Sequence, residues 1–462
     1  MIKFTLTTQL PKQKDIALVS FSDEKESVVI MLPGGQKSIR LGILEKEKIN
    51  RRKLVLLIRQ TVALAKSHQI KRLAFLLDDF VFPSFETTSR VLAELLAVNC
   101  EMANFEFIKY KTRPKEGWNF LEEVIVVSKK ATANIKQGLK IGALIGGEVN
   151  ACRVLVNTPA GEMTPQILAY AAGKAVRGTS VKTTVLGQTE IERLRMGGVL
   201  GVSRGSAEEP CFIILEYWGG EAKEKPIVLV GKGVTFDTGG LNLKPTEGIY
   251  EMHMDMSGAA AVIHAIAASA KLKLNKNIVG LIPAVENMPS GSSYHPGDVL
   301  RTMSGKTIEV LNTDAEGRII LADALLYAKR YRPGLLVDVA TLTSAAIMAL
   351  GQRASAIFST EEDLQKLICE LGEESGDYVW PMPLWEEYEE DIKGTFGDVA
   401  NTGKTRYGGA ITAAMFLKQF IGSFPWVHID IAPRMTSIEG EHLAKGAAGA
   451  PVRLLVKLLE RI

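Results

Sequence analysis

The stretch LNTDAEGRII, residues 311–320, places charged side chains at alternate positions. Asp314 and Glu316 are two residues apart, and Arg318 follows two residues later. In an extended turn the two carboxylates point to the same side of the chain. They repel each other there unless a cation, a shared proton or a base relieves the repulsion. This segment alone leaves two interpretations open, a turn held by a salt bridge to Arg318 or a functional cluster.

The residues around this stretch predict where it lies in the fold. KTIEVLN, before it, alternates polar and apolar residues, which is typical of a strand. RIILADALLYAKRY, after it, has apolar residues at helical spacing. Gly317 stands between the two patterns and can adopt backbone angles that other residues avoid. The pattern predicts a strand-to-helix turn, which is where α/β sheets usually carry their ligands.

A second group of charged residues follows the apolar strand pattern PIVLV. The sequence VGKGVTFDTGGLNLKP carries Lys232, Asp237 and Lys244. It does not fit a phosphate-binding loop, because that motif needs Ser or Thr and then a helix after its lysine, whereas Gly233 follows Lys232. Further along, EMHMDMSGAAA places Asp255 just before a helical pattern of small residues. Both aspartates therefore also stand at the ends of predicted elements.

Four carboxylates thus stand at the ends of predicted strands, which we expect to belong to one sheet: Asp237, Asp255, Asp314 and Glu316. Buried together without cations, they would be strongly destabilising. Hard oxygen donors that share ligands in pairs suit two divalent ions a few ångström apart. The residues by themselves predict a two-metal hydrolase and leave its substrate open.

The composition bounds the class of protein. The chain has 462 residues, 46% of them hydrophobic, which suits two or more domains. The net charge of +3 gives no reason to expect binding to nucleic acid or to a membrane surface. There is no apolar stretch of roughly 18 residues and no signal-peptide core at the start, so we expect a cytoplasmic protein. The four cysteines form no CxxC pair, which makes a cysteine-based zinc site improbable.

The order of patterns along the chain predicts an α/β protein of two domains. Residues 1–130 alternate short strand and helix patterns and predict a small N-terminal α/β domain. A helical stretch over residues 131–156 is expected to link it to the remainder. In residues 157–462, apolar strands followed by glycine-rich turns alternate with helices, as in KPIVLVGKGVTFDTGG and GLLVDVATLTSAA. This larger domain is expected to have a mostly parallel central sheet flanked by helices.

Five motifs in order resemble the leucine aminopeptidase (cytosol aminopeptidase) family of dinuclear metallopeptidases, over roughly residues 150–462. They are NTPAGEMTP, GKGVTFDTGGLNLKP, MDMSGAAAV, NTDAEGR and GGAITAAMFL. The resemblance implies five metal ligands: Lys232, Asp237, Asp255, Asp314 and Glu316. Asp237 and Glu316 would bridge the two ions, Asp314 would serve one ion, and Lys232 with Asp255 the other. Lysine binds a metal only as the neutral amine, so the ion and desolvation must displace its proton.

The resemblance also implies roles around the metals. Lys244 would stabilise the oxyanion, and Arg318 would hold a bicarbonate ion that moves the proton of the attacking water. Residues implied to contact substrate are Asn312, Met252, Thr341 and Met435, together with Lys244 and Asp255. The implied activity is removal of N-terminal residues from short peptides with a free N-terminus, with two Mn or Zn ions per subunit, or Mg in their place. A hexamer of two trimers is the implied assembly.

Two positions depart from the family pattern. Ser344 stands where the family usually has glycine after TLT, and Pro433 stands where it usually has glycine after DIA. Both lie near the implied specificity pocket, so an apolar, leucine-like preference is expected but not a strict one. A two-metal phosphoesterase and a non-catalytic regulatory protein on the same fold are the alternative functions. An intact set of ligands argues against the latter, because a purely structural role needs none of them.

Overall fold

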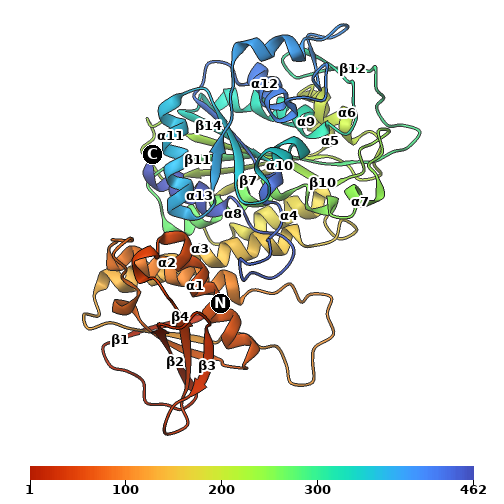
Figure 1. Cartoon of the computed structure of the whole chain (residues 1–462). Helices are drawn as coiled ribbons and strands as arrows, with labels where there is room; N and C mark the ends of the chain where they lie inside the picture. Colours follow the sequence, from red (N-terminus) through yellow and green to blue (C-terminus); the bar gives the residue numbers. More distant parts are fainter. The chain divides into compact units, whose positions relative to one another are not determined.

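The computed structural model describes residues 1–462 and divides into two compact units (Figure 1). The first unit comprises Met1–Asn150 and Ser437–Lys445, and the second comprises Ala151–Thr436 and Gly446–Ile462. The long helix α3, Ala133–Val156, contains the point of division. No helix combines the length and apolar character needed to span a bilayer.

The first unit is a six-stranded sheet with helices packed against it. The strand order is β1-β6-β5-β2-β4-β3, and every pair is parallel except β3 with β4. Helices α1 and α2 pack on each other, and each begins at a polar residue, Asn50 or Thr88, whose side chain accepts a hydrogen bond from the first turn. The elements are β1 (Lys3–Thr7), β2 (Ile16–Ser22), β3 (Val28–Met31), β4 (Lys37–Gly42), α1 (Arg51–Ser67), β5 (Arg72–Leu76), α2 (Ser89–Asn104) and β6 (Glu123–Val127).

The second unit is built on a nine-stranded sheet. Its order is β16-β15-β18-β14-β9-β11-β8-β7, with β10 paired to β11. The central strands β18, β14, β9 and β11 are parallel, whereas β15, β8 and β7 join by antiparallel pairs. The strands are β7 (Lys182–Leu186), β8 (Cys211–Trp218), β9 (Ile227–Gly231), β10 (Gly233–Asp237), β11 (Asn277–Asn287), β14 (Leu335–Ala340), β15 (Ser355–Ser359), β16 (Val379–Pro381) and β18 (Trp426–Asp430).

Helices cover both faces of this sheet. Helices α8 and α9 contact the same central strands, β9 and β11. Val228 and Val230 pack in the apolar cluster that includes α9, and the alternation of side chains turns Leu229 to the other face. The helices are α4 (Pro165–Ala175), α5 (Gln188–Arg193), α6 (Gly197–Ser203), α7 (Thr246–Ile249), α8 (Ser257–Leu272), α9 (Glu316–Ala328), α10 (Ser344–Leu350), α11 (Glu362–Ser375), α12 (Gly409–Ile421) and α13 (Val452–Arg461). The expected α/β fold with a mostly parallel core is confirmed.

A separate three-stranded sheet lies on the chain path to α9. It has the order β12-β13-β17, from β12 (Val299–Arg301), β13 (Thr307–Glu309) and β17 (Val399–Ala400). Strand β13 precedes the turn that carries Asp314, so this turn starts from the small sheet. The prediction that all four carboxylates follow strands of one sheet is wrong for Asp314 and Glu316, and also for Asp255, which follows the short 3₁₀ helix Met252–Met254. Strand pairing depends on partners far along the chain, here β17, which a local pattern does not specify.

Asp323 of α9 offers a test of how the second unit is held together. Its buried carboxylate accepts hydrogen bonds from the backbone N–H groups of Gly198 (2.8 Å) and Val199 (3.2 Å) in α6, and of Met303 (2.9 Å). Asp323→Ala leaves these donors buried without a partner, so we expect the free energy of unfolding to fall by about 3 kcal/mol. Urea unfolding followed by tryptophan fluorescence measures this. Asp363→Ala, at a fully exposed aspartate, is the control and should change stability by less than about 0.5 kcal/mol.

Candidate active site

The ends of neighbouring strands bring the charged residues together. Lys232 follows β9, Asp237 ends β10, and Thr341 follows β14. Strands β9 and β14 are parallel neighbours, so their carboxyl ends meet at one edge of the sheet, where α/β proteins bind ligands. Asp255 reaches the same place from the turn before α8, and Glu316 from the first residue of α9.

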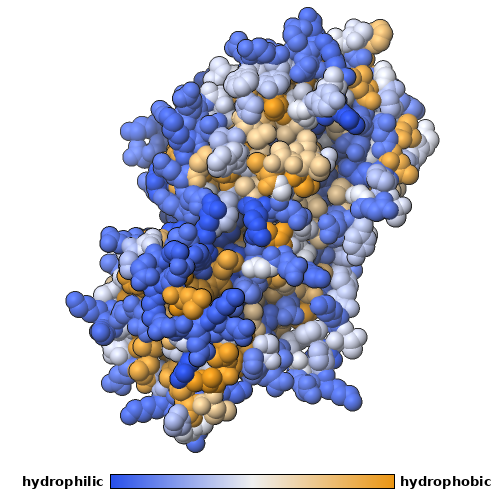
Figure 2. All heavy atoms as spheres, viewed as in Figure 1, coloured by the Kyte–Doolittle hydropathy of each residue, from blue (hydrophilic) through white to orange (hydrophobic).

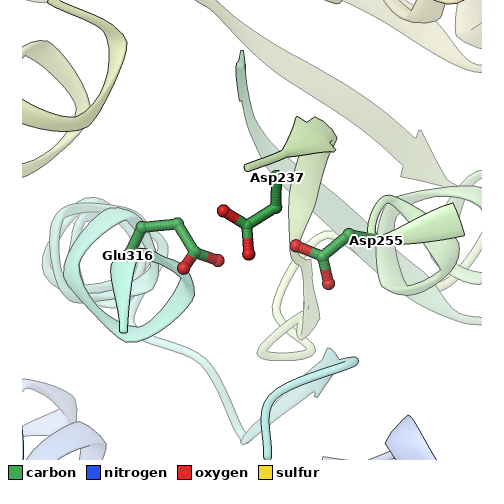
Figure 3. A group of neighbouring side chains, drawn as sticks. All are labelled: Asp237, Asp255 and Glu316. Atoms are coloured by element: carbon green, nitrogen blue, oxygen red, sulfur yellow. The ribbon is translucent and has the colours of Figure 1, made fainter. Parts of the chain in front are cut away.

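Three carboxylates converge at this edge. Atoms of Asp237, Asp255 and Glu316 lie within 4.8 Å of one another. Figure 3 shows the three side chains pointing toward a common space from β10, the turn before α8 and the start of α9. All three residues are at most 3% exposed, so water screens their mutual repulsion poorly.

Lys232 lies between two of these carboxylates. Its Nζ is 2.7 Å from Oδ2 of Asp255 and 2.9 Å from Oε1 of Glu316, and it donates to the carbonyl oxygen of Thr341 at 2.9 Å. Burial by itself favours the neutral amine, but the two carboxylates raise the pKa of Lys232 above its usual value. The side chain is therefore an ammonium that any cation binding to these oxygens must displace or deprotonate.

Lys244 contacts the other pair of acids. Its Nζ lies 2.7 Å from Oδ2 of Asp237 and forms a second ion pair with Oδ1 of Asp314. Burial opposes the charge, and the carboxylates of Asp237, Glu316 and Asp314 outweigh it, so the pKa of Lys244 is also raised. The structure thus brings all four predicted carboxylates and both predicted lysines into one cluster.

The charges of the cluster do not balance. Four carboxylates face two ammonium groups, which leaves two negative charges in excess. Burial and then the neighbouring Glu316 raise the pKa of Asp237 well above its usual range, and burial raises that of Asp255. The cluster therefore takes up a cation, whether a proton or a metal ion, far more readily than isolated aspartates do.

Oxygen atoms suited to a metal remain in the cluster. Asp255 Oδ2, Asp314 Oδ1 and Glu316 Oε1 are buried and accept no hydrogen bond of good geometry, although a lysine ammonium lies at ion-pair distance from each. Carboxylate oxygens with free lone pairs are ligands for Mg²⁺ and Mn²⁺, and Zn²⁺ also accepts them. The donor set therefore fits divalent metal ions.

Neighbouring polar groups fix the carboxylates of Asp237 and Asp255. Asn287 Nδ2 and the backbone N–H of Gly239 both donate to Oδ1 of Asp237, at 2.8 and 2.9 Å. The Thr341 hydroxyl donates to Oδ1 of Asp255 at 2.6 Å. Asn287 is a functional residue that sequence reasoning missed. The only signal was a polar residue at the end of the apolar strand NIVGLIPAVEN.

Gly317 has a different role from the one predicted. It lies inside α9 and is not among the glycines with positive φ, so the expected special backbone angle is wrong. A Cβ atom at this position would lie 2.5 Å from Cε and 2.8 Å from Nζ of Lys232. The glycine is needed for space, because the lysine side chain packs directly against the helix.

Arg318 is buried beside the cluster but forms no salt bridge with it. Its Nη1 donates to the carbonyl oxygen of Asn401 at 2.8 Å, and its Nε donates to nothing. Burial lowers the pKa of Arg318 to about 10. The interpretation of a turn held by a salt bridge from Arg318 to Asp314 or Glu316 is therefore wrong. The guanidinium keeps a donor free for an anion.

Two of the remaining predicted residues contact the cluster, and two are placed only by their elements. Thr341 contacts Asp255 directly, and Asn312 Oδ1 accepts the backbone N–H of Asp314 at 2.8 Å. Met252 begins the short 3₁₀ helix that leads to Asp255. Met435 follows β18, the neighbour of β14, after the short helix Ala432–Arg434.

Comparisons with known proteins agree with this arrangement. The family described as "Cytosol aminopeptidase family, catalytic domain" matches residues 150–456. The chain is 44% identical to a probable cytosol aminopeptidase of Syntrophotalea carbinolica over 80% of this chain and 75% of the relative. A probable cytosol aminopeptidase of Nitrosomonas eutropha is 40% identical over 92% and 85% of the two chains.

Solved structures show a likeness in fold that extends over nearly the whole chain. The bottromycin maturation enzyme BotP superposes with a TM-score of 0.87 at 30% identity, over 97% of this chain and 99% of that one. A second BotP structure, in complex with Mn, gives a TM-score of 0.86. With this likeness in sequence and fold, the chain belongs to the cytosol aminopeptidase family and is a metal-dependent aminopeptidase.

Proposed function

We propose that this aminopeptidase removes N-terminal residues, preferably apolar and leucine-like ones, from short peptides by two-metal hydrolysis. The observation that carries the proposal is the excess of two negative charges in a buried cluster. A single proton would leave part of that excess. With Lys232 as the proposed neutral amine, only Lys244 faces the four carboxylates, and the excess of three negative charges is more than one divalent ion balances. Mn or Zn is the proposed metal, with Mg as the further candidate, and the Mn complex of the similar enzyme BotP supports Mn.

The proposed ligands are the five predicted ones: Lys232, Asp237, Asp255, Asp314 and Glu316. Asp237 and Glu316 would be shared by the two ions, as the family pattern implies. Asp255 and Lys232 would serve one ion and Asp314 the other. Lys232 would bind as the neutral amine after losing its proton.

The reaction assigns different tasks to the neighbouring cations. Bound divalent ions would polarise the scissile carbonyl and lower the pKa of a water molecule, so that water attacks at neutral pH. Lys244 lies in the cluster with most of its side chain buried, and its ammonium can donate to an oxyanion formed there. Arg318 would hold bicarbonate through its free donor, and the bicarbonate would accept the proton of the attacking water.

Residues around the cluster would select the substrate. Asn312, Met252, Thr341 and Met435 are proposed to contact the N-terminal residue of the peptide, together with Lys244 and Asp255. Ser344 is the first residue of α10, and Pro433 lies in the short helix after β18. Both departures from the family pattern therefore stand where chain segments leave the edge of the sheet that carries the site.

A homo-hexamer in the cytoplasm is the proposed state of the enzyme. Figure 2 shows apolar side chains gathered on the visible face of the catalytic unit, in the region of α10. Met348 of α10 is 87% exposed, and Phe396, Tyr407, Trp380 and Trp385 of the same unit are also largely exposed. Exposed apolar patches of this kind mark interaction sites, which supports self-association. The names of the relatives support a cytosolic location.

A panel of aminoacyl anilides tests the proposed function. A chelator should abolish hydrolysis, and Mn²⁺ or Zn²⁺ should restore it, because the ions activate the attacking water. Leucyl anilide should be the best substrate, and its N-acetylated form should not be cut, since a free amine is proposed to fix the substrate. Full activity in protein verified as metal-free by elemental analysis would contradict the mechanism. Cleavage of nitrophenyl phosphate instead of anilides would favour a phosphoesterase.

Two substitutions separate the roles of the flanking cations. Lys244→Ala should lower kcat by roughly 10²–10³, the usual loss for one oxyanion donor, while metal content stays unchanged. Arg318→Ala should also keep both ions, and added bicarbonate should stimulate it far less than bicarbonate-free wild type. Arg330→Ala removes an exposed arginine just beyond the end of α9 and is the control. Equal stimulation of wild type and Arg318→Ala would show that Arg318 does not hold the base.

A further inference from the structure

Asn401 is a buried amide behind the turn that carries Asp314 and Glu316. It directly follows β17 and is 0% exposed. Its backbone N–H donates to the carbonyl oxygen of Glu309 at 3.0 Å, which continues the pairing of β17 with β13. The Glu309 carboxylate in turn accepts the N–H groups of Thr395 and Phe396, in the loop before β17. The backbone of Asn401 is thus fixed independently of the turn.

The side chain of Asn401 closes the turn from behind. Its Oδ1 accepts the backbone N–H groups of Leu311 (2.8 Å) and Asn312 (3.3 Å). Its Nδ2 donates to the carbonyl oxygens of Asn312 (2.6 Å) and Ala315 (3.4 Å). One amide therefore holds Asn312, before Asp314, and Ala315, between Asp314 and Glu316. Only an amide supplies an acceptor and two donors of this size, because a carboxylate lacks the donors and an apolar side chain lacks both.

The carbonyl group of Asn401 holds the other part of the site. It accepts the hydrogen bond from Nη1 of Arg318, at 2.8 Å. One residue therefore fixes the turn through its side chain and the guanidinium through its backbone. Asn401 therefore connects the turn that carries Asp314 to the guanidinium of Arg318.

We propose that Asn401 is a positioning residue, which sets the turn of Asp314 and Glu316 for metal binding and aligns Arg318 with it. The inference rests on the proposed function, since it takes these two carboxylates as metal ligands. Groups that orient ligands without touching the metal commonly change metal affinity or activity by 10- to 100-fold. Neither Asn401 nor its segment GDVANTG was singled out by sequence reasoning.

The chain contains a matched control. Asn277 is 3% exposed and holds a different turn with a similar set of hydrogen bonds, one fewer at its side-chain oxygen. Its Oδ1 accepts the N–H of Gly220 at 3.1 Å, and its Nδ2 donates to the carbonyl oxygens of Glu221 (2.7 Å) and Glu224 (3.0 Å). That turn carries none of the proposed ligands. A purely structural role predicts the same consequences for both asparagines.

The test compares Asn401→Ala, Asn277→Ala and wild type as full-length protein stripped of metal. Mn²⁺ alone is titrated into each protein, and free Mn²⁺ is measured by electron paramagnetic resonance, with urea unfolding measured in parallel. Asn401→Ala should bind Mn²⁺ about 10- to 100-fold more weakly than wild type. Asn277→Ala should lose similar stability and bind Mn²⁺ as wild type does. In Mn²⁺-saturated protein, Asn401→Ala should lower kcat more than it changes KM.

A second variant keeps the test decisive if Asn401→Ala does not fold. Asn401→Asp keeps the volume and the acceptor for Leu311 and Asn312, but it places an oxygen against the carbonyl of Asn312 where a donor stood. It should weaken Mn²⁺ binding to a similar extent. Wild-type affinity in a folded Asn401 variant, or equal weakening in the Asn277 variant, would overturn the inference while leaving the proposed function intact. Wild type that binds no Mn²⁺ would reject the proposed function itself.

Discussion

Burial of like charges is the constraint on which the rest of this structure depends. Four carboxylates lie together, three of them almost completely buried, and only two ammonium groups face them. Removing charged groups from water is expensive unless each finds a partner. Lys232 and Lys244 supply part of that compensation, and the raised pKa of Asp237 shows that it is incomplete. Cations that bind here relieve the repulsion, which links metal binding to the stability of the fold.

Holding the repelling groups in place requires rigid attachments from several directions. The carboxylates come from separate elements: the end of β10, the turn before α8, and the path from the small sheet into α9. Two of them are also tied by neutral hydrogen-bond partners, Asn287 for Asp237 and Thr341 for Asp255, which orient without adding charge. Gly317 lets Lys232 lie against α9. The nine-stranded and the three-stranded sheet both lead residues to the site, and Asn401 connects the three-stranded sheet to the turn of Asp314 and to Arg318.

The sequence predicted the charged residues of the cluster better than the residues that hold them in place. Asp237, Asp255, Asp314 and Glu316 could be identified because their residue types and places after apolar strands are local properties, and the resemblance of the motifs linked them. The sheet to which the turn of Asp314 belongs, and the partner of Arg318, depend on contacts with residues 83 to 90 positions away. Asn401 was missed for the same reason. An asparagine after a short strand is an ordinary turn residue by sequence, and only tertiary contacts distinguish it.

The central claim is that the buried excess of negative charge is compensated by two divalent ions held by these carboxylates. Anomalous diffraction at the manganese edge, from crystals of the full-length protein grown with Mn²⁺, tests it most directly. The account predicts two anomalous peaks per chain, both among Asp237, Asp255, Asp314 and Glu316, with the Lys232 ammonium no longer paired to Asp255 and Glu316. An absence of peaks in this cluster at saturating Mn²⁺, with both lysine ion pairs intact, would contradict it.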